Sequence, residues 1–405
     1  MNTSASRLFS GCVLFCFLWD VPVFTQATVP QNASLAPIKD AADAVAAGNL
    51  QKAETELKTV LAENPNEYHA LNLLGIVRAQ QHRETEAERL FEQAILQKSD
   101  FVSAHVDLGL LFLQTNRQDN AVPEFKEALR LDPGRSDALL SLVNIWRAQA
   151  RNAMHAGDLE KALAVLIQAH KTAPQDTDID FEFGMVALRM SLLPDAVQAF
   201  QQVLAVRKND PTAIYGLGRA QIGLREYQDA RESFEHYTQL HPKDASGHYA
   251  LGFALQALQQ NVDARRQFEE SVELQPAQTE SYFQLGSIDL EEKIWESAAS
   301  RFGKVLQRDP KHGGALTGMG RMEFQRKEYE KAVDFLQRAI ASDPSSREAH
   351  YYLGMSYARS GKKDDSEKEL QLAGQLEHEE VEKHRVVIKI LDSSDPAARQ
   401  LDENK

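Results

Sequence analysis

The sequence predicts an all-α protein, built as a solenoid of stacked helical pairs. Three observations support this prediction. Glycine recurs every 34 residues along most of the chain, alanine follows all but the last of these glycines at a distance of twelve residues, with Ser366 in the last place, and prolines fall between the resulting units. A period of this length is typical of repeat proteins in which one unit cannot bury its apolar surface alone, so each unit packs on the next.

The glycine and alanine positions define the period. The glycines are Gly75, Gly109, Gly184, Gly218, Gly252, Gly286, Gly320 and Gly354. The alanines are Ala87, Ala121, Ala162, Ala196, Ala230, Ala264, Ala298 and Ala332. Small residues at both places allow two helices to cross closely. A Phe or Leu one turn after each alanine is expected to fill the seam between units, and Pro after the second helix to end it.

Residues 1–27 are expected to be a signal peptide. Arg7 precedes the apolar run from Leu8 to Trp19, and small residues end the segment at Ala27, where we expect cleavage. Residues 28–33 form a linker. An uncleaved anchor and a lipid anchor at Cys12 are the alternatives. Because Cys12 and Cys16 both lie in this segment, the mature chain would lack a thiol, which excludes disulfides, cysteine-ligated zinc and a cysteine nucleophile.

Composition excludes several classes of function. Hydrophobic residues make up 43% of the chain and charged residues 26%, which is the balance of a folded protein in water. The formal charge of -14 repels nucleic acid, so we expect no nucleic-acid partner. We also expect no transmembrane span once the signal is removed.

Ten units account for residues 34–380. Their expected bounds are 34–67, 68–101, 102–135, 136–176, 177–210, 211–244, 245–278, 279–312, 313–346 and 347–380. The first unit has Ala41 where glycine is expected, and we interpret it as an N-terminal cap. In Asp132-Pro133, Asp309-Pro310 and Asp343-Pro344 we expect the aspartate to cap and turn the chain into the next helix.

The fourth unit carries a seven-residue insertion before Gly157. Seven residues are close to two helical turns, so the insertion is expected to lengthen the first helix through Trp146, Arg147, Arg151 and Met154 and to project as a ridge. A binding role and a neutral insertion both remain open.

The period fades at the C-terminus. Residues 381–391 contain Val381, Val387, Ile388 and Leu391, and we expect a capping helix laid over the last unit. A self-association surface is the alternative. Residues 392–405 are expected to be a polar tail.

The spacing and the local motifs resemble the tetratricopeptide repeat. Ser-Tyr-Phe-Gln-Leu-Gly at 281–286 and Glu-Tyr-Glu-Lys-Ala at 328–332 come close to that family's consensus. The resemblance covers residues 34–380. It implies a right-handed superhelix of about ten helix-turn-helix units that serves as a protein-interaction scaffold.

No catalytic pattern stands out. The twelve histidines show no metal-ligand spacing, and the Gly216-Leu217-Gly218 run falls inside a helix with no strand before it. We therefore expect no metal, no cofactor and no enzymatic activity.

The resemblance places the binding surface on a concave groove lined by the first helices. The groove residues implied are Phe181, Tyr215, Arg219, Tyr249, Phe253, Phe283, Arg321 and Tyr351. Aromatic rings and arginines suit an extended peptide, although a tyrosine at the fifth position also serves packing. The family's clamp for chaperone tails needs Lys at position 5 and Asn at position 9, and no unit has this pair.

The sequence therefore predicts a non-enzymatic, exported scaffold that binds proteins or peptides, most readily in a bacterial periplasm or otherwise secreted. One alternative is a repeat subunit of an envelope-assembly or enzyme complex whose catalytic part is on another chain. Another is a module that binds glycans or small molecules. Self-association remains open.

Overall fold

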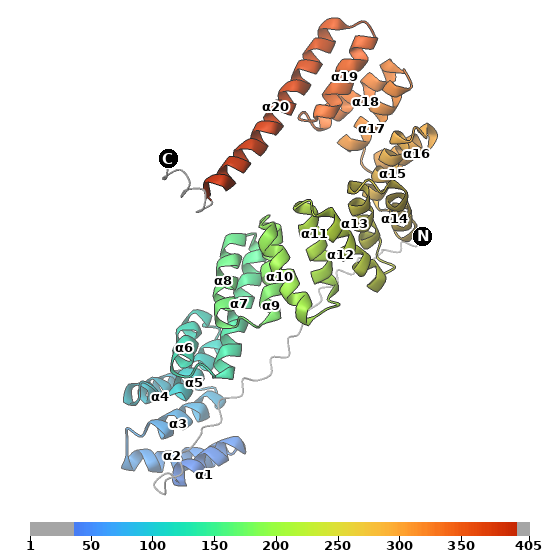
Figure 1. Cartoon of the computed structure of the whole chain (residues 1–405). Helices are drawn as coiled ribbons and strands as arrows, with labels where there is room; N and C mark the ends of the chain where they lie inside the picture. Colours follow the sequence, from blue (N-terminus) through green and yellow to red (C-terminus); the bar gives the residue numbers. More distant parts are fainter. Residues whose placement is uncertain (1–35, 395–405) are drawn as a thin grey trace, which may run out of the picture. The chain divides into compact units, whose positions relative to one another are not determined.

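The computed structural model describes residues 36–394, with side chains through Glu379. Within this part of the chain twenty helices follow one another in helix-turn-helix order and no strand occurs, which confirms the predicted all-α class. Figure 1 shows the paired helices along the chain. They divide into two units, residues 1–190 and 191–405, and the division falls inside the expected fifth repeat. The segments expected to be the signal peptide, the linker and most of the polar tail lie outside the described residues.

The N-terminal unit contains the first nine helices. They are α1 (Ala36–Ala46), α2 (Leu50–Glu63), α3 (Tyr68–Gln80), α4 (Glu84–Gln97), α5 (Val102–Gln114), α6 (Gln118–Leu131), α7 (Ser136–Ala156), α8 (Leu159–Thr172) and α9 (Thr177–Arg189). Each helix packs on the next, and alternate helices such as α3 and α5 also touch.

The C-terminal unit contains the other eleven. They are α10 (Leu193–Val206), α11 (Pro211–Gly223), α12 (Tyr227–Leu240), α13 (Ala245–Ala257), α14 (Asn261–Leu274), α15 (Thr279–Glu291), α16 (Trp295–Arg308), α17 (Gly313–Gln325), α18 (Tyr329–Ser342), α19 (Arg347–Arg359) and α20 (Lys363–Ser394). The first helices α15, α17 and α19 contact one another in turn.

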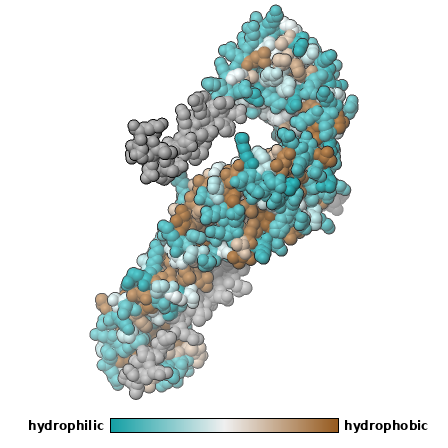
Figure 2. All heavy atoms as spheres, in the orientation of Figure 1, coloured by the Kyte–Doolittle hydropathy of each residue, from teal (hydrophilic) through white to brown (hydrophobic). Residues whose placement is uncertain are grey.

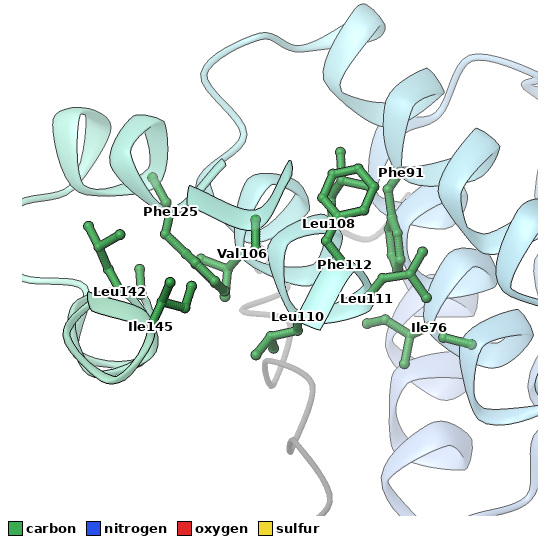
Figure 3. Close-up of a cluster of buried hydrophobic side chains, with 14 of the residues drawn as sticks. Ile76, Phe91, Val106, Leu108, Leu110, Leu111, Phe112, Phe125, Leu142 and Ile145 are labelled. Carbon is green, nitrogen blue, oxygen red and sulfur yellow. The ribbon is translucent and has the colours of Figure 1, made fainter. Parts of the chain in front are cut away.

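The core of the N-terminal unit is a continuous row of buried side chains. Phe91 and Phe125, from the second helices α4 and α6, are fully buried. Figure 3 shows Phe125 between Val106 of α5 and the α7 residues Leu142 and Ile145. In these repeats a phenylalanine of the second helix thus fills the seam between consecutive helical pairs, and Leu57, Leu166 and Leu336 are buried at the equivalent position of three others, in line with the predicted Phe or Leu.

The glycines of the period make room for these rings. A Cβ atom added at Gly286 would lie 2.8 Å from the Phe302 ring of the same repeat, and one added at Gly318 would lie 2.6 Å from the same ring. Phe302 therefore sits between the first helices of two consecutive repeats. The eight alanines of the period are all fully buried.

The aspartates before proline act differently from the prediction. Asp132, Asp309 and Asp343 each accept a hydrogen bond from the backbone N–H two residues later, at 3.1, 3.0 and 3.0 Å. They shape the turn around the proline but do not cap the next helix, because that helix begins four residues on, beyond the reach of their short side chains.

Other residues cap the first helices of the C-terminal unit. Asp210 accepts from the N–H of Ala213 at 3.0 Å, Asp244 from that of Ser246 at 2.9 Å, and Ser346 from that of Ala349 at 3.4 Å. His312 caps α17 through its Nδ1 atom. Each cap fixes the residue at which the helix begins.

The insertion in the fourth repeat lengthens a helix, as expected. Helix α7 has 21 residues, whereas α5 and α9 have 13, and it ends at Gly157 in a left-handed conformation. Trp146 is buried, and Arg147 and Arg151 pair with Glu182 of α9 at 3.1 and 3.0 Å. The two arginines thus pair with the neighbouring helix.

The last helix is continuous. We expected a separate capping helix over 381–391, but these residues belong to α20, which runs from Lys363 to Ser394. No proline or glycine interrupts residues 375–394. Helix formers such as Glu and Lys are frequent there, so nothing in the sequence breaks the helix.

Candidate functional site

The expected binding residues of the C-terminal unit lie on the first helix of each repeat, that is on α11, α13, α15, α17 and α19. We call the surface formed by positions 2, 5, 9 and 12 of these repeats the first-helix face. Tyr215 of α11, Tyr249 of α13 and Phe283 of α15 are half-buried, and Tyr351 of α19 is 46% exposed. Figure 2 shows hydrophobic residues gathered among hydrophilic ones over the region of α11 to α13.

The half-burial of the aromatic rings has one repeated cause. Each ring packs against the core phenylalanine of its own repeat. The ring centroids of Tyr215 and Phe234 are 5.5 Å apart, those of Tyr249 and Phe268 are 5.9 Å apart, and those of Phe283 and Phe302 are 6.1 Å apart. These side chains therefore serve packing on one side and present part of the ring to solvent on the other.

Burial also acts on the tyrosine hydroxyls. It raises the pKa of Tyr215 and that of Tyr249 above the usual value, and nearby carboxylates add to the effect. Both hydroxyls remain neutral at physiological pH, so each can donate as well as accept a hydrogen bond.

Two arginines occupy the ninth position of their repeats. Arg219 of α11 is exposed. The side chain of Arg321 of α17 is 28% exposed, lies 3.4 Å from Glu348 and has its guanidinium 5.8 Å from the Tyr352 ring centroid. Phe253, at the same position of α13, is half-buried and belongs to the core around Phe234 and Phe268.

A pocket opens on the first-helix face at α15, α17 and α19. Its volume is about 250 Å³, and Phe283, Ser287, Thr317, Arg321 and Glu348 contribute to its walls. It lies where the row of aromatic rings is interrupted, because Thr317 occupies the fifth position of α17. The structure thus brings Phe283 and Arg321, both expected binding residues, to one pocket.

Phe181 belongs to α9 in the N-terminal unit and is half-buried there. The other seven expected binding residues all lie in the C-terminal unit.

The residues that create the pocket were not among the predicted binding residues. Gly313, Gly314 and Thr317 are small where other repeats carry larger side chains. The available signal was the absence of an aromatic residue at the fifth position of the ninth repeat. The size of the resulting gap, however, depends on the packing of three helices.

The described residues lack two kinds of feature. Among them, no group of three or more His, Cys, Asp or Glu side chains is placed to hold a metal ion. No helix in that part of the chain combines the length and apolarity needed to cross a membrane.

Three curated proteins are similar to parts of this chain. Protein O-mannosyl-transferase TMTC3 of Homo sapiens is 30% identical over 151 residues, which are 36% of this chain and 16% of that protein. Cellulose synthase operon protein C of Pseudomonas fluorescens is 29% identical over 134 residues, 32% of this chain and 10% of that protein. Lipopolysaccharide assembly protein B of Escherichia coli K12 is 28% identical over 116 residues, which are 29% of this chain and 24% of that protein. The chain spans less than a quarter of each.

Solved structures are similar in fold over part of the chain. MamA of Desulfovibrio magneticus RS-1 has 23% identity and a TM-score of 0.40, and covers 42% of this chain and 96% of its own. YrrB, described as a TPR protein with an unusual peptide-binding site, has 26% identity and a TM-score of 0.39. The match covers 45% of this chain and 95% of the YrrB chain.

Family models match most of the helical region. The tetratricopeptide-repeat model matches residues 40–100, 85–136, 147–214, 181–245 and 215–279, and a TPR-repeat model matches residues 320–361. Because these matches cover more than half of its residues, the chain belongs to the tetratricopeptide-repeat family.

Proposed function

We propose that the protein is a non-enzymatic, exported scaffold that binds an extended segment of another protein along the first-helix face of α11 to α19. The observation that carries this proposal is the row formed by Tyr215, Tyr249, Phe283 and Tyr351, with Arg219 and Arg321 beside it. The rings of Tyr215, Tyr249 and Phe283 are held on one side by the core, the ring of Tyr351 lies against Tyr352, and all four rings are partly accessible.

This arrangement suits a polypeptide ligand. Partly exposed aromatic rings offer apolar contact at little cost in conformational freedom, since the core already fixes their rotamers. The exposed guanidinium of Arg219 can pair with a carboxylate of the bound segment. Arg321 already pairs with Glu348, so an acidic group of the ligand is expected at Arg219 and not at Arg321.

The test is a comparison of surface variants. Arg219→Glu and Tyr351→Ser change exposed groups of the first-helix face and leave the core intact, whereas Tyr215 and Tyr249 also hold the core. The matched control is Arg266→Glu on the second helix α14, whose side chain is 72% exposed. Partners are cross-linked to the wild-type chain in its host, and the proteins that co-purify with it in equal amount are identified. We expect Arg219→Glu and Tyr351→Ser to lose these proteins, and Arg266→Glu to keep them. Unchanged co-purification would contradict the proposal.

Export to the bacterial periplasm is part of the proposal. The apolar run before Ala27 supports it, as does the similarity to proteins named for lipopolysaccharide assembly and for a cellulose synthase operon. N-terminal sequencing of the protein from its host is expected to begin at Thr28. A chain in the cytoplasm that begins at Met1 would contradict export.

A second candidate is a repeat subunit of an envelope-assembly or enzyme complex whose catalytic part is on another chain. The names of the curated relatives favour it, one being a transferase and another an assembly protein. It predicts co-purification with a stoichiometric enzyme. Stabilisation by glycans in a thermal melt without any protein partner would instead indicate a glycan-binding module.

A further inference from the structure

The pocket at α15, α17 and α19 results from three departures from the repeat pattern. At the fifth position, Tyr215, Tyr249, Phe283 and Tyr351 are aromatic, but α17 carries Thr317. The first two residues of the same helix, Gly313 and Gly314, have no side chain to fill the space beside them. The first-helix face therefore lacks one ring in its row and has a cavity of about 250 Å³ there.

The glycines also hold the pocket open. A Cβ atom added at Gly314 would lie 2.9 Å from the Phe283 ring, and one added at Gly318 would lie 2.6 Å from the Phe302 ring. These two rings thus lie against bare helix backbone; Phe302 and Leu290 are buried behind the pocket, and the half-buried Phe283 ring is the apolar surface that the pocket presents. An apolar cavity of about 150 Å³ accepts benzene, so this pocket has room for a phenyl, phenol or indole group.

Three polar side chains at the rim have partners within the protein, whereas the buried Nε of Arg321 has none. The Ser287 hydroxyl donates to the Phe283 carbonyl at 3.0 Å, and the Ser346 hydroxyl accepts from the N–H of Ala349 at 3.4 Å. Asp343 accepts from the N–H of Ser345 at 3.0 Å.

The charges at the rim favour an uncharged ring. A carboxylate in the pocket would approach Asp343 and Glu348, which also line it. The Arg321 guanidinium lies over Tyr352 and close to Glu348. A guanidinium plane stacks well on an aromatic ring and gains less from an aliphatic side chain.

We propose that this pocket receives one aromatic side chain, of Tyr, Phe or Trp, from the segment bound along the first-helix face. The proposal rests on the proposed function and names its anchor residue. The incoming ring replaces the one that α17 lacks and completes the row between Phe283 and Tyr351.

The experiment is a selection of random heptapeptides displayed on phage against the full chain, followed by affinity measurement with synthetic peptides. The test variant is Thr317→Phe, which places in the pocket the kind of side chain that the other repeats carry at this position. The control is Lys331→Phe on the second helix α18, where the side chain is 65% exposed and adds the same apolar area elsewhere. Circular dichroism melting checks the fold of both variants.

We expect the selected peptides to share one aromatic residue. Replacing that residue by leucine should weaken binding about tenfold, in line with the 1 to 2 kcal/mol of stacking and cation–π contacts. Thr317→Phe should weaken the same peptides at least as much, and Lys331→Phe should leave their affinity unchanged. The leucine peptide decides the question even if Thr317→Phe does not fold.

Two contrary results are distinguishable. Peptides that bind without an aromatic residue, or that tolerate its replacement by leucine, would overturn the pocket proposal while leaving the first-helix face as the binding surface. Failure to enrich any peptide over the empty support would overturn the proposed function and the pocket proposal together.

Discussion

The eighth position of a repeat is glycine because the core ring of the same repeat lies directly on the helix there. A Cβ atom at Gly252 would lie 2.7 Å from Cε1 of Phe268, and the equivalent distance at Gly218 is 2.7 Å from Phe234. Where the core residue is Leu336, the glycine is Gly320 and the distance is 2.5 Å. The identity of the core residue changes, but the need for an empty position does not.

Gly252→Leu is therefore expected to destabilise the C-terminal unit by about 1 to 3 kcal/mol or more through overpacking against Phe268. Denaturant unfolding followed by circular dichroism measures the loss. Gly303 provides the control, because it also lies inside a helix, α16, but has no atom within 4 Å of an added Cβ. Gly303→Ala should raise stability by about 0.5 to 1 kcal/mol. An unchanged unfolding curve for Gly252→Leu would contradict the assigned packing.

A buried histidine recurs at the fourth position of three repeats. Nδ1 of His105 lies 2.8 Å from Glu124 and Nε2 lies 3.2 Å from the Ser99 carbonyl. His350 has the same two kinds of partner, Glu369 and the Pro344 carbonyl, whereas His248 faces Gln267. Carboxylate and carbonyl oxygens only accept hydrogen bonds, so both ring nitrogens of His105 must carry a proton to satisfy both.

The pKa of His105 is accordingly raised. Burial alone would lower it, but the hydrogen bonds to Glu124 and to the Ser99 carbonyl, together with the charge of Glu124, outweigh burial. The resulting stability is fully present below the unfolded value of about 6.5 and is lost as the pH rises through the raised pKa. Hydrogen-exchange protection factors of the α5 and α6 amides should therefore fall as the pH rises above about 6.5 and through the raised pKa of His105. Glu124→Gln should lower the pKa of His105 in an NMR titration, and an unchanged pKa would contradict this account.

At the scale of the element, the turn between the two helices of a repeat is strained in most repeats. His82, Asn116, Ser191, Arg225, Gln259, Lys293 and Lys327 all adopt a positive φ at this turn. Gly48, Gly157 and Gly361 fill the same place in the other three repeats. The N–H of Ile294 bonds to the Asp289 carbonyl, which is the helix-ending pattern that requires the left-handed residue at 293.

Lys293→Gly should stabilise the C-terminal unit by about 1 kcal/mol, because glycine adopts a φ of 61° without the steric cost that lysine has. The reverse change, Gly361→Lys, should destabilise it by a similar amount. Nothing lies within 4 Å of a Cβ atom at Gly361, so only backbone strain contributes. Thermal melts of the two variants check the opposite signs, and a shift in the same direction for both would contradict the explanation.

Much of the element structure follows from the sequence. The recurrence of glycine, alanine and proline predicts two helices per repeat, and the extra residues before Gly157 predict the long α7. The roles of the aspartates before proline were not predictable from spacing alone. Asp132 accepts from the N–H two residues later in a turn, whereas Asp210 accepts from the N–H three residues later and caps a helix. The residue type is the same in both cases, and only the backbone geometry differs.

At the scale of the whole molecule, the sequence indicates which residues of the C-terminal unit form the first-helix face, but it does not determine how much of each is accessible. Tyr215 and Tyr249 are partly used by the core, whereas Arg219 and Tyr351 are exposed. The pocket at Thr317 depends on what is missing from a repeat, and its volume comes from the positions of three helices. The proposed binding function therefore uses a departure from the repeat as well as the repeat itself.

The central claim is that another protein lies along the first-helix face, and site-specific photo-cross-linking in the host tests it most directly. A benzophenone amino acid replaces Thr212 in one variant and Arg266 of α14 in the other; Thr212 is an exposed residue at position 2 of the α11 repeat and leaves Arg219 in place. We expect a discrete covalent adduct, identified by mass spectrometry, from position 212 and none from position 266. Adducts of equal yield at both positions, or at position 266 alone, would contradict the claim.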